Sequence, residues 1–447
     1  MLFKNYLRLI DNGSDEKTKK IRKDILDILS SAIESVDPYN SVKKKFKNKR
    51  ILLDDKIIEL TDFDNVFLVS FGKASIGMAK AVFDSVDIKK GIVVTNEKKT
   101  KIDHKNIETI TASHPIPDEN SISAAEKILS LVKGCKSNDL LIVLISGGGS
   151  ALLCKPKVSL PDMQKTTDLL LKSGADIKEI NTIRKHISEV KGGQLIKNIK
   201  CKTISLVISD IINDPLDFIA SGPTYPDPTT YQDAKNILIN YRIWDKIPEK
   251  VRMVIKDGIL KKINETPDFD NPIFNNVSNY VVANNSLACE SASQKAENLG
   301  YKSMIITTSL EGEAKDVADF LIEKAKIYKT YAQKMIFICG GETTVTVRGK
   351  GKGGRNQEMV LASVDKISSQ KIIFCSFATD GIDGDSDAAG ALCDKNTIKK
   401  AKNLGLNPDD FLKNNDSYNF FKKIGDLFLT GPSGTNVMDI QLIVKYK

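Results

Sequence analysis

Glycine-rich loops that carry charged or hydroxyl side chains are the parts of this sequence best suited to chemistry. The first runs from Ser70 to Gly77 and holds Lys73 beside Gly72. Glycines let a ligand approach the backbone, the N–H groups of a following helix attract anions, and the lysine adds a point charge. The spacing is neither the Walker A pattern nor G-x-G-x-x-G. We therefore predict an anion site at Lys73 without a standard nucleotide motif.

A second loop, Ser146-Gly147-Gly148-Gly149-Ser150, directly follows the apolar run Leu140–Ile145. Three consecutive glycines cost backbone entropy, and close approach of a ligand is a natural reason for them. A plain turn needs only one or two glycines. The two serines would add hydroxyl donors. We predict substrate binding by Ser146, Gly147, Gly148 and Ser150.

Arg184 and His186 lie together on a helical pattern. Arginine is scarce here, with eight arginines among 66 basic residues, and His186 is one of three histidines. The planar guanidinium fork suits a carboxylate or phosphate, so both residues join the substrate-binding candidates. Lys185 and Lys191 are expected to be ordinary solvated cations.

Asp210 ends the apolar run that begins at Thr203. A carboxylate in this position suits a general base or a magnesium ligand. Asp214 and Asp227 stand beside prolines and are more typical of turns.

The second half of the chain carries further glycine clusters. Gly340-Gly341-Glu342 follows a strand-like run, and residues 349–355 hold four glycines and three cations before a helix that opens at Asn356. Such a segment is typical of a polyphosphate cradle. Asp380 and Asp383, among glycines after another apolar run, could hold a metal ion or a ribose.

The elements that must position these loops alternate between strands and helices. Continuous β-branched runs separated by helical patterns predict parallel strands covered on both faces. Open α/β sheets bind ligands at the carboxyl ends of their strands, where these loops lie. The predicted strands of the first half are Val66–Ser70, Gly91–Thr95, Ile107–Thr111, Leu140–Ile145 and Thr203–Ser209.

The chain has 447 residues, which is too long for one ordinary core. The segment from Lys262 to Asn279 contains two prolines and five asparagines and has no helical period. We therefore expect two domains, at residues 1–272 and 273–447. A first helix is predicted from Lys17 to Val36, within the first domain.

Composition narrows the class of protein. Hydrophobic residues make up 41% and charged residues 28%, which is typical of a soluble globular protein. The net charge of +9 is spread over scattered lysines, so nucleic acid is not an expected partner. Apolar runs are too short to span a membrane, and no signal peptide is visible. Seven cysteines without a C-x-x-C pair favour the cytoplasm and no zinc.

Ten blocks, in order from about residue 69 to 440, resemble the glycerate kinase family called the glycerate 2-kinase or MOFRL family. The blocks are F-G-K-A-S at Phe71, S-H-P-I-P-D at Ser113, S-G-G-G-S-A at Ser146, R-K-H-I-S at Arg184, S-D-I-I-N-D-P at Ser209, S-G-P-T-Y-P-D-P-T at Ser221, G-G-E-T-T-V at Gly340, G-G-R-N-Q-E at Gly353, T-D-G-I-D-G at Thr379 and G-P-S-G-T-N at Gly431.

This resemblance implies a Rossmann-like N-terminal domain, a smaller α/β C-terminal domain and an active site in the cleft between them. It also implies ATP, Mg²⁺ and phosphorylation of D-glycerate, on the 2-hydroxyl group to give 2-phosphoglycerate and ADP. Lys73 and Arg355 match the family's catalytic candidates. Leu216, where the family commonly has an acid, and Ser433, often threonine, are departures.

We assign the remaining roles from residue chemistry. Asp210 would be the base, and Lys73 and Arg355 would neutralise charge on the transferred phosphoryl group. Asp380 and Asp383 would hold Mg²⁺. A homo-oligomer is left open. The expected nucleotide-binding residues are Gly340, Gly341, Glu342, Gly353, Gly354 and Asn356.

Two other functions stay open. Members of the family have been labelled as hydroxypyruvate reductases, which use NAD(P)H, and Glu97 could imitate a ribose-binding acid. The absence of G-x-G-x-x-G counts against that dinucleotide. A non-catalytic phosphosugar-binding protein is the other alternative, because S-G-G-G-S resembles phosphate loops of sugar-isomerase domains.

Overall fold

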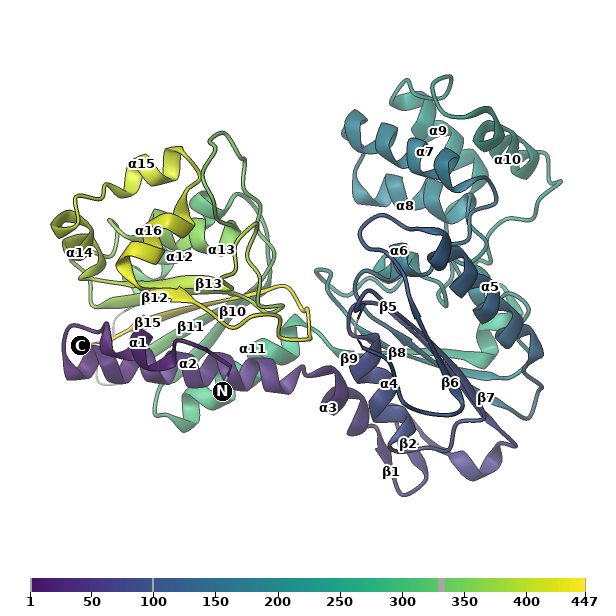
Figure 1. Ribbon diagram of the computed structural model, residues 1–447, viewed down its shortest axis with the longest axis horizontal. Coiled ribbons are helices and arrows are strands. Elements are labelled where there is room, and N and C mark those ends of the chain that lie inside the picture. Colours follow the sequence, from purple (N-terminus) through teal and green to yellow (C-terminus); the bar gives the residue numbers. More distant parts are fainter. Residues whose placement is uncertain (1, 99, 329–333, 447) are drawn as a thin grey trace. The chain divides into compact units, whose positions relative to one another are not determined.

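The computed structural model describes residues 2–98, 100–328 and 334–446 (Figure 1). The chain forms two compact units, which we call the middle unit (Pro38–Val282) and the terminal unit (Met1–Asp37 with Ala283–Lys447). This division differs from the predicted one at residue 272, because the first 37 residues pack with the C-terminal part. None of the helices in the described ranges has the length and apolar character needed to span a membrane.

The middle unit is built on a six-stranded sheet of order β6-β5-β4-β7-β8-β9. The pairings among the first five strands in this order are all parallel, which confirms the predicted Rossmann-like sheet. The strands are β4 (Val66–Phe71), β5 (Lys90–Thr95), β6 (Ile107–Thr111), β7 (Leu140–Ile145), β8 (Lys202–Ile208) and β9 (Val277–Ala283). Strand β9 lies after the predicted boundary at residue 272, but it extends this sheet beside β8.

Helices and a small antiparallel sheet complete the middle unit. Apolar side chains of α5 (Glu119–Gly134) pack on one face of the parallel sheet, in one buried cluster with Val69 and Val143. Four helices form a separate layer with a core of its own: α7 (Leu160–Ser173), α8 (Ile177–His186), α9 (Tyr231–Asn240) and α10 (Glu249–Ile259). The other elements are α3 (Pro38–Lys43), α4 (Ser75–Phe83), α6 (Gly149–Leu152), β1 (Phe46–Lys47), β2 (Arg50–Leu52) and β3 (Ile57–Glu59).

The terminal unit contains a six-stranded mixed sheet of order β10-β11-β15-β12-β13-β14. The last strand, β15, inserts antiparallel between β11 and β12. Among the described strands of this sheet, β10 and β11 are the only neighbours that pair in parallel. The strands are β10 (Lys302–Leu310), β11 (Met335–Gly341), β12 (Ile372–Ala378), β13 (Gly390–Asp394), β14 (Leu427–Phe428) and β15 (Asp439–Lys445). This mixed α/β sheet agrees with the expected α/β class of the second domain.

Helices cover both faces of the mixed sheet (Figure 1). The helix predicted near the N-terminus is α2 (Glu16–Ser35), which lies with α11 (Asn285–Asn298) on one face. Arg22 of α2 is fully buried and pairs with Asp394 and Asp426, each at 2.6 Å. The remaining helices are α1 (Tyr6–Asp11), α12 (Ala314–Ile327), α13 (Arg355–Ser363), α14 (Thr397–Asn403), α15 (Pro408–Lys413) and α16 (Ser417–Ile424).

Candidate active site

The first two predicted loops contact each other at the carboxyl edge of the parallel sheet. Strands β4 and β7 are neighbours, and the loops follow them directly. The N–H of Lys73 donates to the carbonyl of Gly147 at 2.9 Å, and the N–H of Ala74 donates to Ser146 Oγ at 3.1 Å. These two N–H groups of the turn before α4 are therefore hydrogen-bonded to the neighbouring loop. The side chains of the turn remain available to contact a ligand.

Two glycines of the second loop make room for three polar side chains. A Cβ atom on Gly147 would overlap the carboxylate of Asp210. A Cβ atom on Gly148 would lie 2.9 Å from Cδ2 of His114 and 3.2 Å from Cγ of Lys73. The glycines thus allow close packing of protein side chains, whereas the sequence suggested close approach of a ligand. Lys73, Asp210 and His114 all border the same short segment of backbone.

His114 is a candidate site residue that sequence reasoning missed. It follows β6 at the same edge of the sheet, within the S-H-P block, and half-buried surroundings lower its pKa, with Lys73 as the second cause. A lowered pKa keeps the imidazole neutral at pH 7, so it can accept a hydrogen bond. Its position three residues after the end of a predicted strand was the available signal.

Ser150 belongs to a buried network behind this edge. Its hydroxyl lies 2.8 Å from that of Ser221, which donates to Oδ1 of Asn181 on α8 at 3.1 Å. Lys191 Nζ donates to the carbonyls of Ser150 (2.6 Å) and Leu153 (3.3 Å). Lys191 is only 1% exposed, so the expectation of a solvated lysine is wrong. Backbone carbonyls at the end of the short helix α6 replace water around its charge.

Arg184 lies beside Lys191 in this buried region. Its Nε is buried without a hydrogen-bond partner among the described residues. Burial lowers the pKa of Arg184. Burial, followed by the charge of Arg184, also lowers the pKa of Lys191 to about 7. Two adjacent cations, one with an unused buried donor, form a site that an anion would stabilise.

The neighbours of Arg184 on α8 face the helical layer. His186 Nδ1 lies 2.7 Å from the Thr182 carbonyl, and its ring packs edge-on against Tyr231. Through these contacts the His186 ring is part of the core of the helical layer. The substrate-binding role of His186 stays a prediction. Lys185 is buried and pairs with Asp227 at 3.3 Å, so it is not solvated either.

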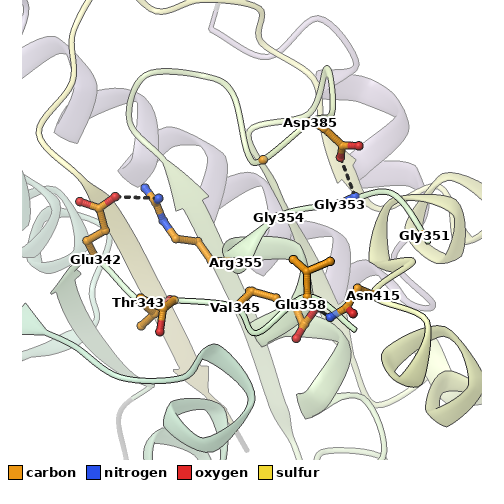
Figure 2. Close-up of a pocket in the computed structure, with 13 residues that line it drawn as sticks. Glu342, Thr343, Val345, Gly351, Gly353, Gly354, Arg355, Glu358, Asp385 and Asn415 are labelled. Carbon is orange, nitrogen blue, oxygen red and sulfur yellow. Dashed lines mark hydrogen bonds and ion pairs between the residues drawn. The ribbon is translucent and has the colours of Figure 1, made fainter. Parts of the chain in front are cut away.

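The terminal unit contains a separate pocket of about 560 Å³ (Figure 2). Arg355, the first residue of α13, stands at its edge. Its Nε and Nη2 donate to the two carboxylate oxygens of Asp439 at 2.5 and 3.0 Å, and its Nη1 pairs with Glu342 at 2.7 Å. The pocket is lined by Glu342, Thr343, Thr344, Val345, Val347, Gly351, Gly353, Gly354, Arg355, Glu358, Gly384, Asp385 and Asn415.

Comparisons with known proteins find two family matches in the chain. Residues 335–439 match the MOFRL family, and residues 24–256 match a domain of unknown function, DUF4147. A glycerate 2-kinase of Pyrococcus horikoshii is 46% identical over 95% of this chain and 97% of its own length. The crystal structure of a glycerate kinase from Thermotoga maritima superposes with a TM-score of 0.84 at 39% identity, covering 96% of this chain and 100% of that one.

The chain belongs to the glycerate kinase family that carries the MOFRL domain. A further relative, 40% identical over 84% of this chain and 86% of its own length, is named a putative hydroxypyruvate reductase of Agrobacterium vitis. The name of our alternative function, hydroxypyruvate reductase, is therefore also used for a relative of this chain.

The glycine loop of this MOFRL domain differs from the expected phosphate cradle. Its N–H groups already donate within the protein, from Gly349 to Asn415, from Lys350 to Asn414, from Lys352 to Asp416 and from Gly353 to Asp385. A cradle needs N–H groups that point at the ligand. The described loop is instead a pocket wall held by side-chain oxygens.

Asp383 does not fit the predicted metal ligand. Its carboxylate accepts four hydrogen bonds, from the backbone and side-chain N–H groups of Asn356 and Gln357, and so caps the start of α13. Asp380 accepts one, from the N–H of Ile382. Among the residues that the structure describes, no three His, Cys, Asp or Glu side chains form a metal-binding group.

The other predicted nucleotide residues divide into two sets. Glu342, Gly353 and Gly354 line the pocket. Asn356 is buried and its side chain is taken up by Asp383 and Ser376. Gly340 and Gly341 pack closely against other parts of the chain, since a Cβ atom on either would overlap Asn285 or the backbone of Leu310. We regard Asn356, Gly340 and Gly341 as residues that stabilise the structure around the pocket.

Proposed function

We propose that this protein is an ATP-dependent kinase that phosphorylates D-glycerate on its 2-hydroxyl group, releasing 2-phosphoglycerate and ADP. Family membership supports the reaction class, because full-length relatives carry that name. The observation in this chain that best supports the proposal is that Lys73, His114 and Asp210 all lie against Gly147 and Gly148. No ion pair involving Lys73 is found within the described ranges, so its ammonium can meet an incoming anion.

Phosphoryl transfer asks a protein mainly for positioning and for neutralisation of charge. Lys73 would stabilise the charge on the transferred group. Asp210 would accept the proton that the glycerate hydroxyl loses as its oxygen bonds to phosphorus. Neutral His114 would hold the hydroxyl or the lysine in place through a hydrogen bond.

The carboxylate of glycerate is the anion that we assign to Arg184 and Lys191. A buried guanidinium donor without a partner and an ammonium beside it match the charge and geometry of a small carboxylate. Ser146 accepts from Ala74 and can still donate its own hydroxyl proton to the substrate.

Arg355 is the residue that we expect to face the nucleotide phosphates. Asp439 and Glu342 use three of its five N–H groups, which leaves two donors. ATP would supply the phosphoryl group, and Mg²⁺ would neutralise its charge. Mg²⁺ commonly needs only one or two carboxylates from a protein, so Asp380 alone would be sufficient. That Lys73 and Arg355 act on one phosphoryl group stays a prediction, as do the cleft and a cytoplasmic location.

A reductase is less well supported by the same geometry. The pyrophosphate of NAD(P)H binds to free N–H groups at a glycine turn and helix N-terminus. Here the N–H groups of Lys73 and Ala74 bond to Gly147 and Ser146. A phosphosugar-binding protein would not need the acid, imidazole and ammonium that gather at Gly147 and Gly148.

One experiment separates the three functions. Purified protein is incubated with D-glycerate and ATP–Mg²⁺, or with hydroxypyruvate and NADH, and ADP or NADH is followed. We expect ADP release that requires glycerate, and phosphorus NMR should show 2-phosphoglycerate as the product. NADH oxidation instead would establish the reductase, 3-phosphoglycerate would correct the position of transfer, and turnover of neither pair would remove the enzymatic proposal.

A further inference from the structure

The pocket at α13 has the wrong chemistry for a polyphosphate. Among its lining residues Arg355 is the single cation, whereas Glu342, Glu358 and Asp385 are acids. Four N–H groups of the glycine loop, which could have offset these charges, are bonded to side-chain oxygens of the protein. Carboxylates repel phosphate oxygens, but they accept hydrogen bonds readily from hydroxyl groups.

Glu358 is the acid best placed to accept such bonds. It lies three residues after Arg355, so both side chains project from the same face of α13, about 4.5 Å apart along the axis. Figure 2 shows Arg355 beside Glu342 and Glu358 beside Asn415. The residue is only 4% exposed, and its Oε2 accepts from Asn415 Nδ2 at 2.9 Å. Acceptor positions on Glu358 remain after this bond.

Thr343 is an independent sign that the pocket holds a polar ligand. Its Oγ1 is buried and has no hydrogen-bond partner in the described part of the chain, and the residue lines the pocket. Leaving a buried hydroxyl unsatisfied costs about 1–3 kcal/mol. A ligand hydroxyl or ring nitrogen would satisfy it. Val345 and Val347 add apolar wall that suits the face of a base.

We propose that this pocket binds the nucleoside end of the nucleotide, with Glu358 accepting hydrogen bonds from the vicinal ribose hydroxyls. Arg355, one helical turn earlier, then faces the phosphates. Carboxylates hold ribose hydroxyls in the same way in dinucleotide-binding folds. Thr343 supplies a further polar contact. The inference rests on the proposed kinase function for the identity of the ligand, but its test measures binding and needs no turnover.

Titration calorimetry of the full-length protein with ADP and with 2′,3′-dideoxyADP tests the ribose contact. We expect the wild-type protein to bind ADP at least about tenfold more tightly, the scale of a hydrogen bond to a charged group. Glu358→Gln keeps the shape and an acceptor for Asn415, and it should lose most of that preference. Asp316→Asn, which removes an exposed charge from α12 of the same unit, should keep it.

Thr343→Val gives a second, distinct readout. It removes a buried hydroxyl without a partner, so the melting temperature should stay unchanged or rise, while ADP affinity should fall. A change that was merely structural would lower both quantities.

Equal affinity of the wild-type protein for the two nucleotides would overturn the ribose assignment, and this comparison holds even if a variant fails to fold. A preference that survives in Glu358→Gln would overturn the role of Glu358. Ribose-dependent binding without glycerate phosphorylation would support the pocket and reject the kinase proposal. Phosphorylation of glycerate without a ribose preference would support the kinase proposal and reject the ribose assignment.

Discussion

Arg355 shows how one side chain can be fixed and still remain available. Burial alone would lower its pKa, but Asp439 and Glu342 hold the pKa above its ordinary value, so the guanidinium is always charged. The carboxylate of Asp439 accepts hydrogen bonds from two nitrogens of the planar guanidinium, and this fixes the direction of the two remaining N–H donors of Arg355. A residue held in this way neutralises charge without having to reorganise during the reaction.

The first prediction follows from this geometry. Arg355→Lys keeps the charge, but a single ammonium cannot grip both oxygens of Asp439 and reach Glu342. We expect turnover to fall by at least about tenfold, equivalent to about 1.4 kcal/mol of barrier. Arg348→Lys, an exposed arginine of the same loop, is the matched control and should retain its turnover. Normal turnover of a folded Arg355→Lys protein would show that the fork is not used.

The second prediction concerns pH and Lys191. Only a protonated lysine attracts a carboxylate, and the pKa of Lys191 is about 7 because of burial and Arg184. As pH rises through this value the ammonium loses its proton, so kcat/KM for glycerate should fall by up to about tenfold between pH 6 and pH 9. Steady-state kinetics across this range measures the effect.

Lys191→Met should have a low kcat/KM already at pH 6 and lose the pH dependence contributed by this group. Methionine fills a similar buried volume, so folding should be retained. Lys178→Met removes an exposed charge from the same helix as Arg184 and should keep the wild-type profile. A wild-type profile in Lys191→Met would exclude Lys191 from the anion site.

Single residues show where prediction from sequence stops. Lys73, Asp210 and Arg355 could be proposed as candidates because strand ends and scarce residue types are visible in the sequence, and their roles stay predictions. Lys185 and Lys191 could not be separated from surface lysines, because their burial depends on Asp227 and on carbonyls of Ser150 and Leu153 that are distant in sequence.

At the scale of elements, the glycine loop after β7 illustrates a different limit. The sequence shows that Gly147 and Gly148 need space, but only the structure shows that His114, Lys73 and Asp210 fill it. The mixed sheet is a similar case. Alternation of strands and helices predicted α/β units, yet β15 pairs with β11 and β12 over a long stretch of chain. Such pairing is decided by tertiary packing and leaves no local signal.

The third prediction uses two glycines with nearly the same backbone. Gly148 has φ +80° and Gly174 has φ +79°, but a Cβ atom on Gly174 would meet nothing within 4 Å. Alanine at either position should cost about 1–2 kcal/mol through left-handed strain. Gly148→Ala should in addition displace His114 and Lys73 and lower kcat/KM at least about tenfold.

Thermal melts and kinetics of both variants check this prediction. Gly174→Ala should be less stable than the wild-type protein by the backbone strain alone and should keep the wild-type kcat/KM. Equal kinetics in the two variants would mean that the side chains at Gly148 take no part in the reaction.

At the scale of the whole molecule, the two compact units are not two consecutive segments of the chain. The middle unit is one continuous segment, with a parallel sheet that β9 completes. The terminal unit is assembled from both ends of the chain. Sequence reasoning found α2 within one residue at each end but placed it in the wrong unit. Its apolar stripe shows that it must be covered and does not show by which sheet.

The contacts of the first 37 residues explain why the terminal unit needs them. Arg22 is buried between Asp394 and Asp426, Asn12 Nδ2 donates to Asp426 at 2.7 Å, and the hydroxyl of Tyr301 donates to Asp24 at 2.7 Å. Removing one partner of a buried ion pair costs about 3–5 kcal/mol, because a desolvated charge is left behind. That cost is a large share of the 5–15 kcal/mol that typically holds a domain together.

The last prediction is that residues 38–282 fold as an isolated fragment, whereas residues 283–447 do so only when residues 1–37 are supplied. Without α2, Asp394 and Asp426 would be two buried carboxylates without Arg22, and the face of α11 that contacts α2 would be exposed. We expect residues 283–447 alone to melt without cooperativity in circular dichroism. Joining residues 1–37 to the end of that fragment through a flexible linker should restore a cooperative transition. The same joined fragment with Arg22→Met should melt at a lower temperature, since both acids then lose their partner. A cooperative transition of residues 283–447 alone would show that the N-terminal helices only decorate a unit that is already complete.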